Sequence, residues 1–183
     1  MIGCLPKSLN VNGKDYPIRS DYRVALLIFQ AFEDNELNSY EKLAVCLECL
    51  YEEIPSDTEE AYKKASWFLD GGDMPKSQKA PKKIIDWQQD EHYMFSALNK
   101  TAGKEIRELE FVHWWTFLGL FSEMGEGLYS QIINIRRKKA KGKKLEKYEQ
   151  EFYRENKELI DIRPNYTKEE QAEIDFINGL VGD

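Results

Sequence analysis

Residues 111–147 decide the fold: FVHWWTFLGLF is followed by SEMGEG and then by LYSQIINIRRKKAKGKKLEK. In the first part, apolar residues lie almost all the way round a helix, which is typical of burial on several sides. Gly125 and Gly127 predict a break in that helix. Apolar residues then recur from Leu128 to Ile135 at the spacing of one helical face. This order predicts two packed helices that lead into a dense basic run.

The aromatic segment predicts the largest block of hydrophobic core. We expect it to form a helix over about 108–124, packed against the helix that follows and against a helix over 84–98. A charged helix over 143–159 comes next. The expected core residues of this half are Trp114, Trp115, Leu118, Phe121, Ile132 and Ile135.

The N-terminal half begins with a hairpin signal. Asn12-Gly13 separates two short segments, and this dipeptide suits a type I′ turn because both of its residues need a positive φ. Three helices are expected next, over 20–32, 39–51 and 57–69, and Gly71-Gly72 ends the third. Residues 75–81 (PKSQKAP) are polar and lack an apolar period, which predicts a linker at 73–83.

These patterns predict a mainly α protein, a helical bundle with a short N-terminal β-hairpin. The parts are residues 1–72, a C-terminal helical core at 84–160 and a helical tail at 161–183. In the tail, Thr167 and Glu170 form a capping-box pattern. The alternative is that all of these parts form one globular unit.

Composition excludes several classes of protein. The chain has 183 residues with 42% hydrophobic content, enough to bury a substantial core. A net charge of −7 argues against a general nucleic-acid binder. No apolar run of about 18 residues predicts a membrane span, and residues 1–10 do not resemble a secretory signal. An odd number of cysteines, Cys4, Cys46 and Cys49, is expected in a reducing cytoplasm.

Charge is segregated along the chain. Residues 33–60 hold ten acidic residues and one basic residue, whereas 136–147 holds eight basic residues and one acidic residue. One interpretation of the basic run is a set of cations that offsets the exposed carbonyls at a helix end. The other is a solvent-exposed docking patch for an acidic partner or a phosphate. The partner-binding candidates are Arg136, Arg137, Lys138, Lys139, Lys141, Lys143 and Lys144.

No pattern in the sequence predicts catalysis, a cofactor or a metal. Cys46-Leu47-Glu48-Cys49 is a lone CxxC in the middle of an expected helix, without the further ligands that zinc needs. His113 lacks a nucleophile or a carboxylate spaced to match it, so a buried, hydrogen-bonded histidine is the simpler interpretation. Neither a P-loop nor a dinucleotide-binding glycine motif occurs.

One family resemblance rests on motifs in residues 86–159. They are Asp90 within DWQQDEHYMFSAL, His113-Trp114-Trp115 with Phe117, Ile132-Ile133-x-Ile135-Arg136, and the helix KKLEKYEQEFYREN. In these features the chain resembles the bacteriophage "gene product fifteen" family of Gram-positive phages and prophages. The first 35 residues are also similar to that family and to phage tail assembly chaperones.

The resemblance implies a non-enzymatic tail assembly chaperone in the host bacterial cytoplasm. Its implied partners are the tape measure protein, the tail-tube protein and a companion chaperone. Self-association is a further possibility, with the basic run of one copy meeting the acidic 33–60 region of another. The alternative is a nucleic-acid-binding or regulatory phage protein that uses residues 136–147. An enzyme with an unrecognised site is the least favoured interpretation.

Overall fold

The chain starts with the expected hairpin. In the computed structural model, which describes residues 3–73 and 82–181, β1 (Ser8–Val11) pairs antiparallel with β2 (Lys14–Pro17). Asn12 and Gly13 have φ values of 50° and 86°, as a type I′ turn requires. Leu9, Val11 and Tyr16 are buried, and β1 packs against the third helix. The hairpin therefore closes one side of the N-terminal core.

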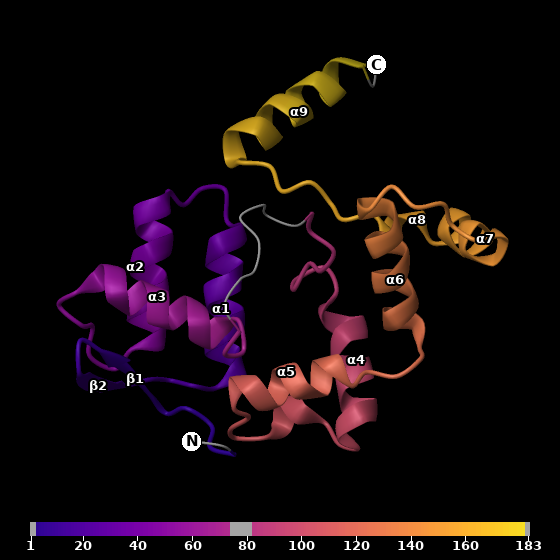
Figure 1. The fold of residues 1–183 in the computed structure, drawn as a ribbon. Helices are drawn as coiled ribbons and strands as arrows, with labels where there is room; N and C mark the ends of the chain where they lie inside the picture. The colour runs from indigo at the N-terminus through magenta and orange to yellow at the C-terminus, as the bar shows by residue number, and fades with distance from the viewer. Residues whose placement is uncertain (1–2, 74–81, 182–183) are drawn as a thin grey trace.

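Three helices of equal length follow, each started by a side chain that caps it. They are α1 (Tyr22–Glu33), α2 (Ser39–Leu50) and α3 (Thr58–Leu69). Asp21, Asn38 and Asp57 accept hydrogen bonds from backbone N–H groups in the first turns. α1 packs on α2 and α2 on α3, so these helices form one layered unit with the hairpin (Figure 1).

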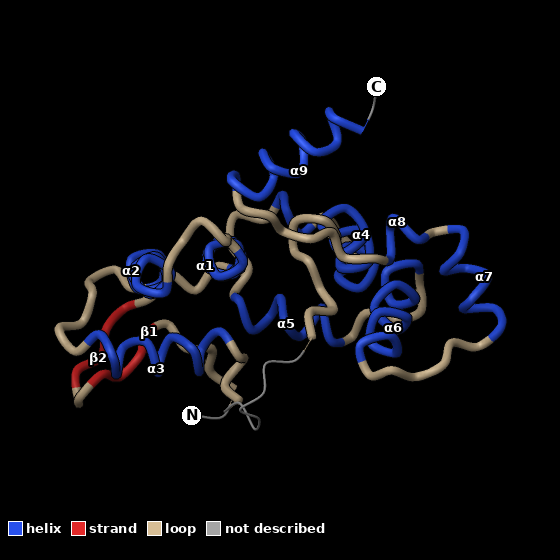
Figure 2. The backbone as a smooth tube through the Cα atoms, turned by 90° about the horizontal axis from the view of Figure 1, so that it is seen from above, coloured by secondary structure: helices blue, strands red, loops and turns tan. Residues whose placement is uncertain are grey.

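The rest of the described chain is also helical. Its elements are α4 (Glu91–Ala102), the 3₁₀ helix η1 (Ile106–Glu108), α5 (Trp114–Ser122), α6 (Leu128–Ala140), α7 (Lys147–Glu155), α8 (Lys157–Ile160) and α9 (Lys168–Val181). α5 and α6 each pack on α4, and α8 packs on α6 and α7. α9 stands apart from the other helices in both views (Figures 1 and 2). The expected mainly α bundle with an N-terminal hairpin is confirmed.

The aromatic helix is shorter than expected because the residues just before it are hydrogen-bonded to a segment that is distant in the sequence. α5 begins at Trp114, not near residue 108. The Tyr22 N–H donates to the Val112 carbonyl at 2.9 Å, and the Trp114 N–H donates to the Ser20 carbonyl at 2.8 Å. These bonds hold the chain just before Trp114 beside the start of α1 in a non-helical conformation, so α5 begins only at Trp114.

Two other expected helices also differ. The helix expected over 84–98 begins only at Glu91, because the Asp86 carboxylate accepts the Gln88 and Gln89 N–H groups in a turn before it. The charged helix expected over 143–159 begins at Lys147 and divides at Asn156 into α7 and α8. Residues 74–81 of the expected linker lie outside the described residues.

Aromatic rings join the two halves of the chain in one hydrophobic core. Tyr22 of α1 stacks on Phe117 of α5 with centroids 4.8 Å apart, and Phe29 of α1 lies 5.7 Å from Trp114. The Trp114 and Trp115 indole N–H groups donate to the last carbonyls of α3, on Leu69 and Phe68. α5 therefore contacts both halves.

Burial divides the expected core residues into two groups. Trp114, Ile132 and Ile135 are buried, whereas Trp115, Leu118 and Phe121 are half-buried around them. Phe117, which was not among the expected core residues, is fully buried. Among the described residues, no helix combines the length and the apolar character needed to cross a membrane.

Replacing Trp114 with alanine tests whether its indole ring lies at the centre of the hydrophobic core. The side chain is 1% exposed and its N–H is bonded to Leu69. We expect Trp114→Ala to lower the free energy of unfolding by about 3–5 kcal/mol in urea titrations. Tyr40→Ala, at a residue that is 84% exposed, is the control and should change it by less than about 0.5 kcal/mol. Equal effects from the two variants would contradict the described core.

Candidate functional site

Arg136, the first residue of the basic run, has a structural role. Arg136 was expected in a solvent-exposed patch, but it is 5% exposed on the inner face of α6. Its guanidinium forms a bidentate ion pair with Asp90, at 2.6 and 2.9 Å. Burial on the inner face removes Arg136 from the docking patch.

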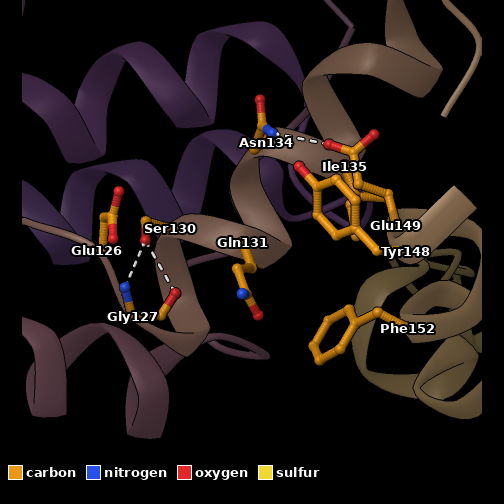
Figure 3. Close-up of a pocket in the computed structure, with 9 residues that line it drawn as sticks. All are labelled: Glu126, Gly127, Ser130, Gln131, Asn134, Ile135, Tyr148, Glu149 and Phe152. Carbon is orange, nitrogen blue, oxygen red and sulfur yellow. Dashed lines mark hydrogen bonds between the residues drawn. The ribbon is translucent and has the colours of Figure 1, made fainter. Parts of the chain in front are cut away.

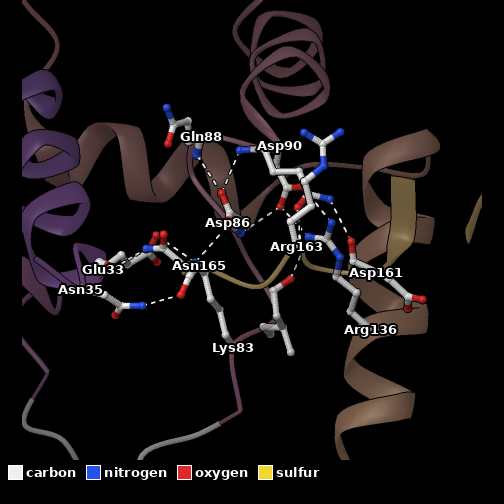
Figure 4. A network of polar contacts seen from close by, with 12 residues as sticks. Glu33, Asn35, Lys83, Asp86, Gln88, Asp90, Arg136, Asp161, Arg163 and Asn165 are labelled. Carbon is white, nitrogen blue, oxygen red and sulfur yellow. Dashed lines mark hydrogen bonds and ion pairs between the residues drawn. The ribbon is translucent and has the colours of Figure 1, made fainter. Parts of the chain in front are cut away.

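Arg136 also uses every donor that it has. Besides the two bonds to Asp90, Nε donates to the Ile160 carbonyl at 2.6 Å, Nη1 to Ile84 and Nη2 to Leu159. A guanidinium has five N–H bonds, so all five are satisfied. Asp90 in turn accepts from the Asp86 N–H at 3.0 Å. Figure 4 shows how this network joins the segment before α4 to α6 and to the end of α8.

A helical pattern in the sequence could have revealed this pair. Asp90 lies four and eight residues before Met94 and Leu98, and all three are fully buried. Arg136 lies four residues after Ile132, which is also fully buried. Opposite charges on two apolar helical faces are a signal for a buried ion pair, because a lone buried charge is too costly.

Two of the lysines in the run are paired within the chain. Lys138 Nζ lies 2.7 Å from Glu149 of α7, and this hydrogen bond raises the pKa of Lys138 and lowers the pKa of Glu149. Lys139 pairs with Asp161 and lies 3.8 Å from the centre of the Tyr153 ring. These two residues attach α7 and α8 to α6, which limits their use for a partner.

The remaining cations form what we call the exposed basic segment. Its members are Arg137, Lys141, Lys143, Lys144 and Lys147. All are exposed, and within the described part of the chain they make no ion pair. Gly142 has a φ of 65°, and the Lys143 N–H donates to the Lys138 carbonyl, so a glycine motif ends α6 in the middle of this segment.

A groove lies beside the exposed basic segment, between α6 and α7. Its volume is about 470 Å³, and it is lined by Glu126, Gly127, Ser130, Gln131, Asn134, Ile135, Tyr148, Glu149 and Phe152. Gln131 of α6 and Phe152 of α7 face the same opening (Figure 3). Tyr148 is 65% exposed at its edge. No sequence pattern indicates this groove, because it depends on how α7 packs on α6.

The groove and the exposed basic segment together can bind a protein segment. The groove is lined by the apolar side chains of Ile135 and Phe152 and by two carboxylates, Glu126 and Glu149, of which Glu149 is paired with Lys138. The exposed basic segment leads from the end of α6 into the start of α7 and so follows the two helices that border the groove. Such a surface suits an acidic helix with an apolar face. We therefore regard it as the candidate functional site.

The histidine and the CxxC cysteines named above as possible catalytic or metal-binding residues lie in or next to packed helices. His113 is 3% exposed and caps α5: its Nδ1 accepts the Trp115 N–H, which leaves Nε2 as the donor to the Pro6 carbonyl at 2.9 Å. Cys46 is fully buried in α2, and Cys49 lies one turn further on. Across residues 3–73 and 82–181, no cluster of three or more potential metal ligands occurs.

The ion pair gives a sharp prediction for stability. Arg136→Ala leaves the Asp90 carboxylate buried without its cation, and we expect it to lower the free energy of unfolding by about 3–5 kcal/mol. Arg137→Ala, on the neighbouring exposed residue, should change it by less than about 0.5 kcal/mol. Replacing Asp90 and Arg136 together with leucine should recover most of the loss. A loss in the double variant as large as in Arg136→Ala would contradict the assigned pair.

The buried thiol should be unreactive. Burial, with a smaller effect of Cys49, raises the pKa of Cys46 to about 12. At neutral pH the group is then a thiol and not the nucleophilic thiolate. We expect iodoacetamide to leave Cys46 unmodified in the folded protein and to modify it in denaturant, as followed by mass spectrometry. Exposed Cys4 is the internal control. Rapid modification of Cys46 under native conditions would overturn its buried position.

Comparison with known proteins places the chain in a family. A family model described as "Bacteriophage Gp15 protein" matches residues 1–162, and residues 163–183 lie beyond the match. Neither a curated protein nor a solved structure matches the chain. The match covers most of the sequence and includes Asp90, Arg136 and the candidate site. The chain belongs to the bacteriophage Gp15 protein family.

Proposed function

We propose that this phage protein is a non-enzymatic tail assembly chaperone that binds the tape measure protein during virion morphogenesis. The observation that carries the proposal is the exposed basic segment beside the α6–α7 groove. Arg136, Lys138 and Lys139 are held by carboxylates of the same chain, whereas Arg137, Lys141, Lys143, Lys144 and Lys147 are exposed and make no ion pair within the described part of it.

The chemistry of this surface supports a protein partner. Lysines on a loop attract an acidic surface, but they do not hold their charges in the fixed geometry that a small ligand would need. The apolar groove adds contact area for a helical segment. Membership of a bacteriophage family supports a phage partner, and the resemblance to tail assembly chaperones supports the tape measure, the tail-tube protein or a companion chaperone. Tail assembly would place the protein in the host cytoplasm.

Co-purification with the tape measure of the same phage tests the proposal. We expect the tagged protein to retain the co-expressed tape measure. Lys143→Glu with Lys144→Glu should reduce the retained amount at least about tenfold, because attraction by the exposed basic segment becomes repulsion. Lys7→Glu with Lys104→Glu is the matched control, since both residues are exposed and the change in net charge is the same. Circular dichroism checks that each variant is folded.

Two outcomes would contradict the proposal. One is tape measure retention that is equal in the two paired variants. The other is salt-sensitive binding of the purified protein to double-stranded DNA in a gel shift at physiological salt, lost in the Lys143→Glu and Lys144→Glu variant. That second result would favour the nucleic-acid-binding alternative.

A further inference from the structure

The C-terminal helix is the least covered element of the chain. α9 (Lys168–Val181) stands away from the other helices in both views of the backbone (Figures 1 and 2). Phe176, in its second half, is 69% exposed. A large aromatic side chain in water on an isolated helix is a candidate anchor for a contact with another molecule.

The charge of α9 is opposite to that of the exposed basic segment. Residues 168–175 (KEEQAEID) carry four acidic residues and one basic residue. Glu169, Glu173 and Phe176 are all exposed. The aromatic anchor matches the apolar residues of the groove described above, and the acidic residues match the exposed basic segment, which leads from α6 into α7.

Contacts at the base of α9 keep it from the groove of its own chain. The Asn165 side-chain amide donates to the Glu33 carbonyl at 2.7 Å, and Asn35 donates back to the Asn165 carbonyl. The Lys168 N–H donates to the Glu36 carboxylate at 2.6 Å. Figure 4 shows the Asn165 contacts beside Glu33 and Asn35. These bonds fix the start of α9 beside the end of α1, on the other side of the molecule from α7 (Figure 1).

We propose that α9 of one copy docks into the α6–α7 groove of a second copy. Phe176 enters beside Phe152 and Tyr148, and Glu169 and Glu173 face the exposed basic segment. The contact joins two different surfaces, so each copy still offers one free α9 and one free groove. Repetition of such a heterologous contact builds a ring or an open filament. The inference shares the exposed basic segment with the proposed function but does not require a tape measure.

The test uses the purified full-length protein without any partner. Sedimentation velocity over a range of concentrations should show the wild type as species larger than a dimer, which become smaller at high salt. Phe176→Asp should weaken self-association at least about tenfold, as removal of a central aromatic anchor does. Glu169→Lys with Glu173→Lys should also weaken it. These residues are exposed, so the variants should remain folded.

Mixing two defective variants gives the decisive result. Phe176→Asp has an intact groove and a defective helix, whereas Lys143→Glu with Lys144→Glu has an intact helix and a defective groove. Each alone should be monomeric, and an equimolar mixture should form a dimer and nothing larger, because only one intact contact can be made. A mixture that stays monomeric would overturn the head-to-tail pairing.

Tyr40→Asp is the matched control, because Tyr40 is 84% exposed on α2, within the acidic region 33–60. It should associate like the wild type. If Tyr40→Asp is monomeric and Phe176→Asp is not, region 33–60 is the contact surface and the proposal is wrong. A wild type that is monomeric at all concentrations overturns it too. Tape measure retention by Phe176→Asp separates the two proposals, since the tail assembly role survives if retention is unchanged.

Discussion

The buried ion pair between Asp90 and Arg136 is the interaction on which the C-terminal half depends. Removing two charges from water is costly, and the cost is offset only when the geometry is good and every remaining donor is bonded. Here the pair is bidentate, and the three other guanidinium N–H bonds go to carbonyls of Ile84, Leu159 and Ile160. One side chain on α6 therefore fixes the entry to α4 and the exit from α8. Both members of the pair belong to motifs that carry the family resemblance.

The same pair determines which cations are left for binding. With Arg136 turned inward, α6 presents Lys138 to Glu149 and Lys139 to Asp161, and these bonds place α7 and α8 beside it. The groove between α6 and α7 exists because of that placement. The basic run thus has two roles. Arg136, Lys138 and Lys139 hold the C-terminal helices together through ion pairs, and the exposed basic segment remains available at the surface.

The sequence predicts the turns and helix caps that depend on neighbouring residues. It does not predict the features that depend on contacts between residues far apart in the chain. Asn12-Gly13 and the Thr167–Glu170 capping box each act within a few residues, and the structure contains both of them. The start of α5 was misplaced because its approach is paired with residues 20–22, about 90 positions earlier. The exposure predicted for Arg136 is wrong for the same reason, since its partner Asp90 lies 46 residues earlier, just before α4. The groove depends on packing alone and has no local signature.

The segregation of charge has a consequence for how copies meet. The acidic region 33–60, which contains α2, and the basic end of α6 lie on opposite sides of the molecule (Figure 1). Separated blocks of opposite charge contribute a permanent electric dipole, in addition to the net charge of −7. Two dipoles approaching in solution rotate into line before they touch, and this orientation is lost as salt shortens the range of the field. At low ionic strength, collisions between copies would therefore occur mostly with the positive side of one molecule facing the negative side of the next.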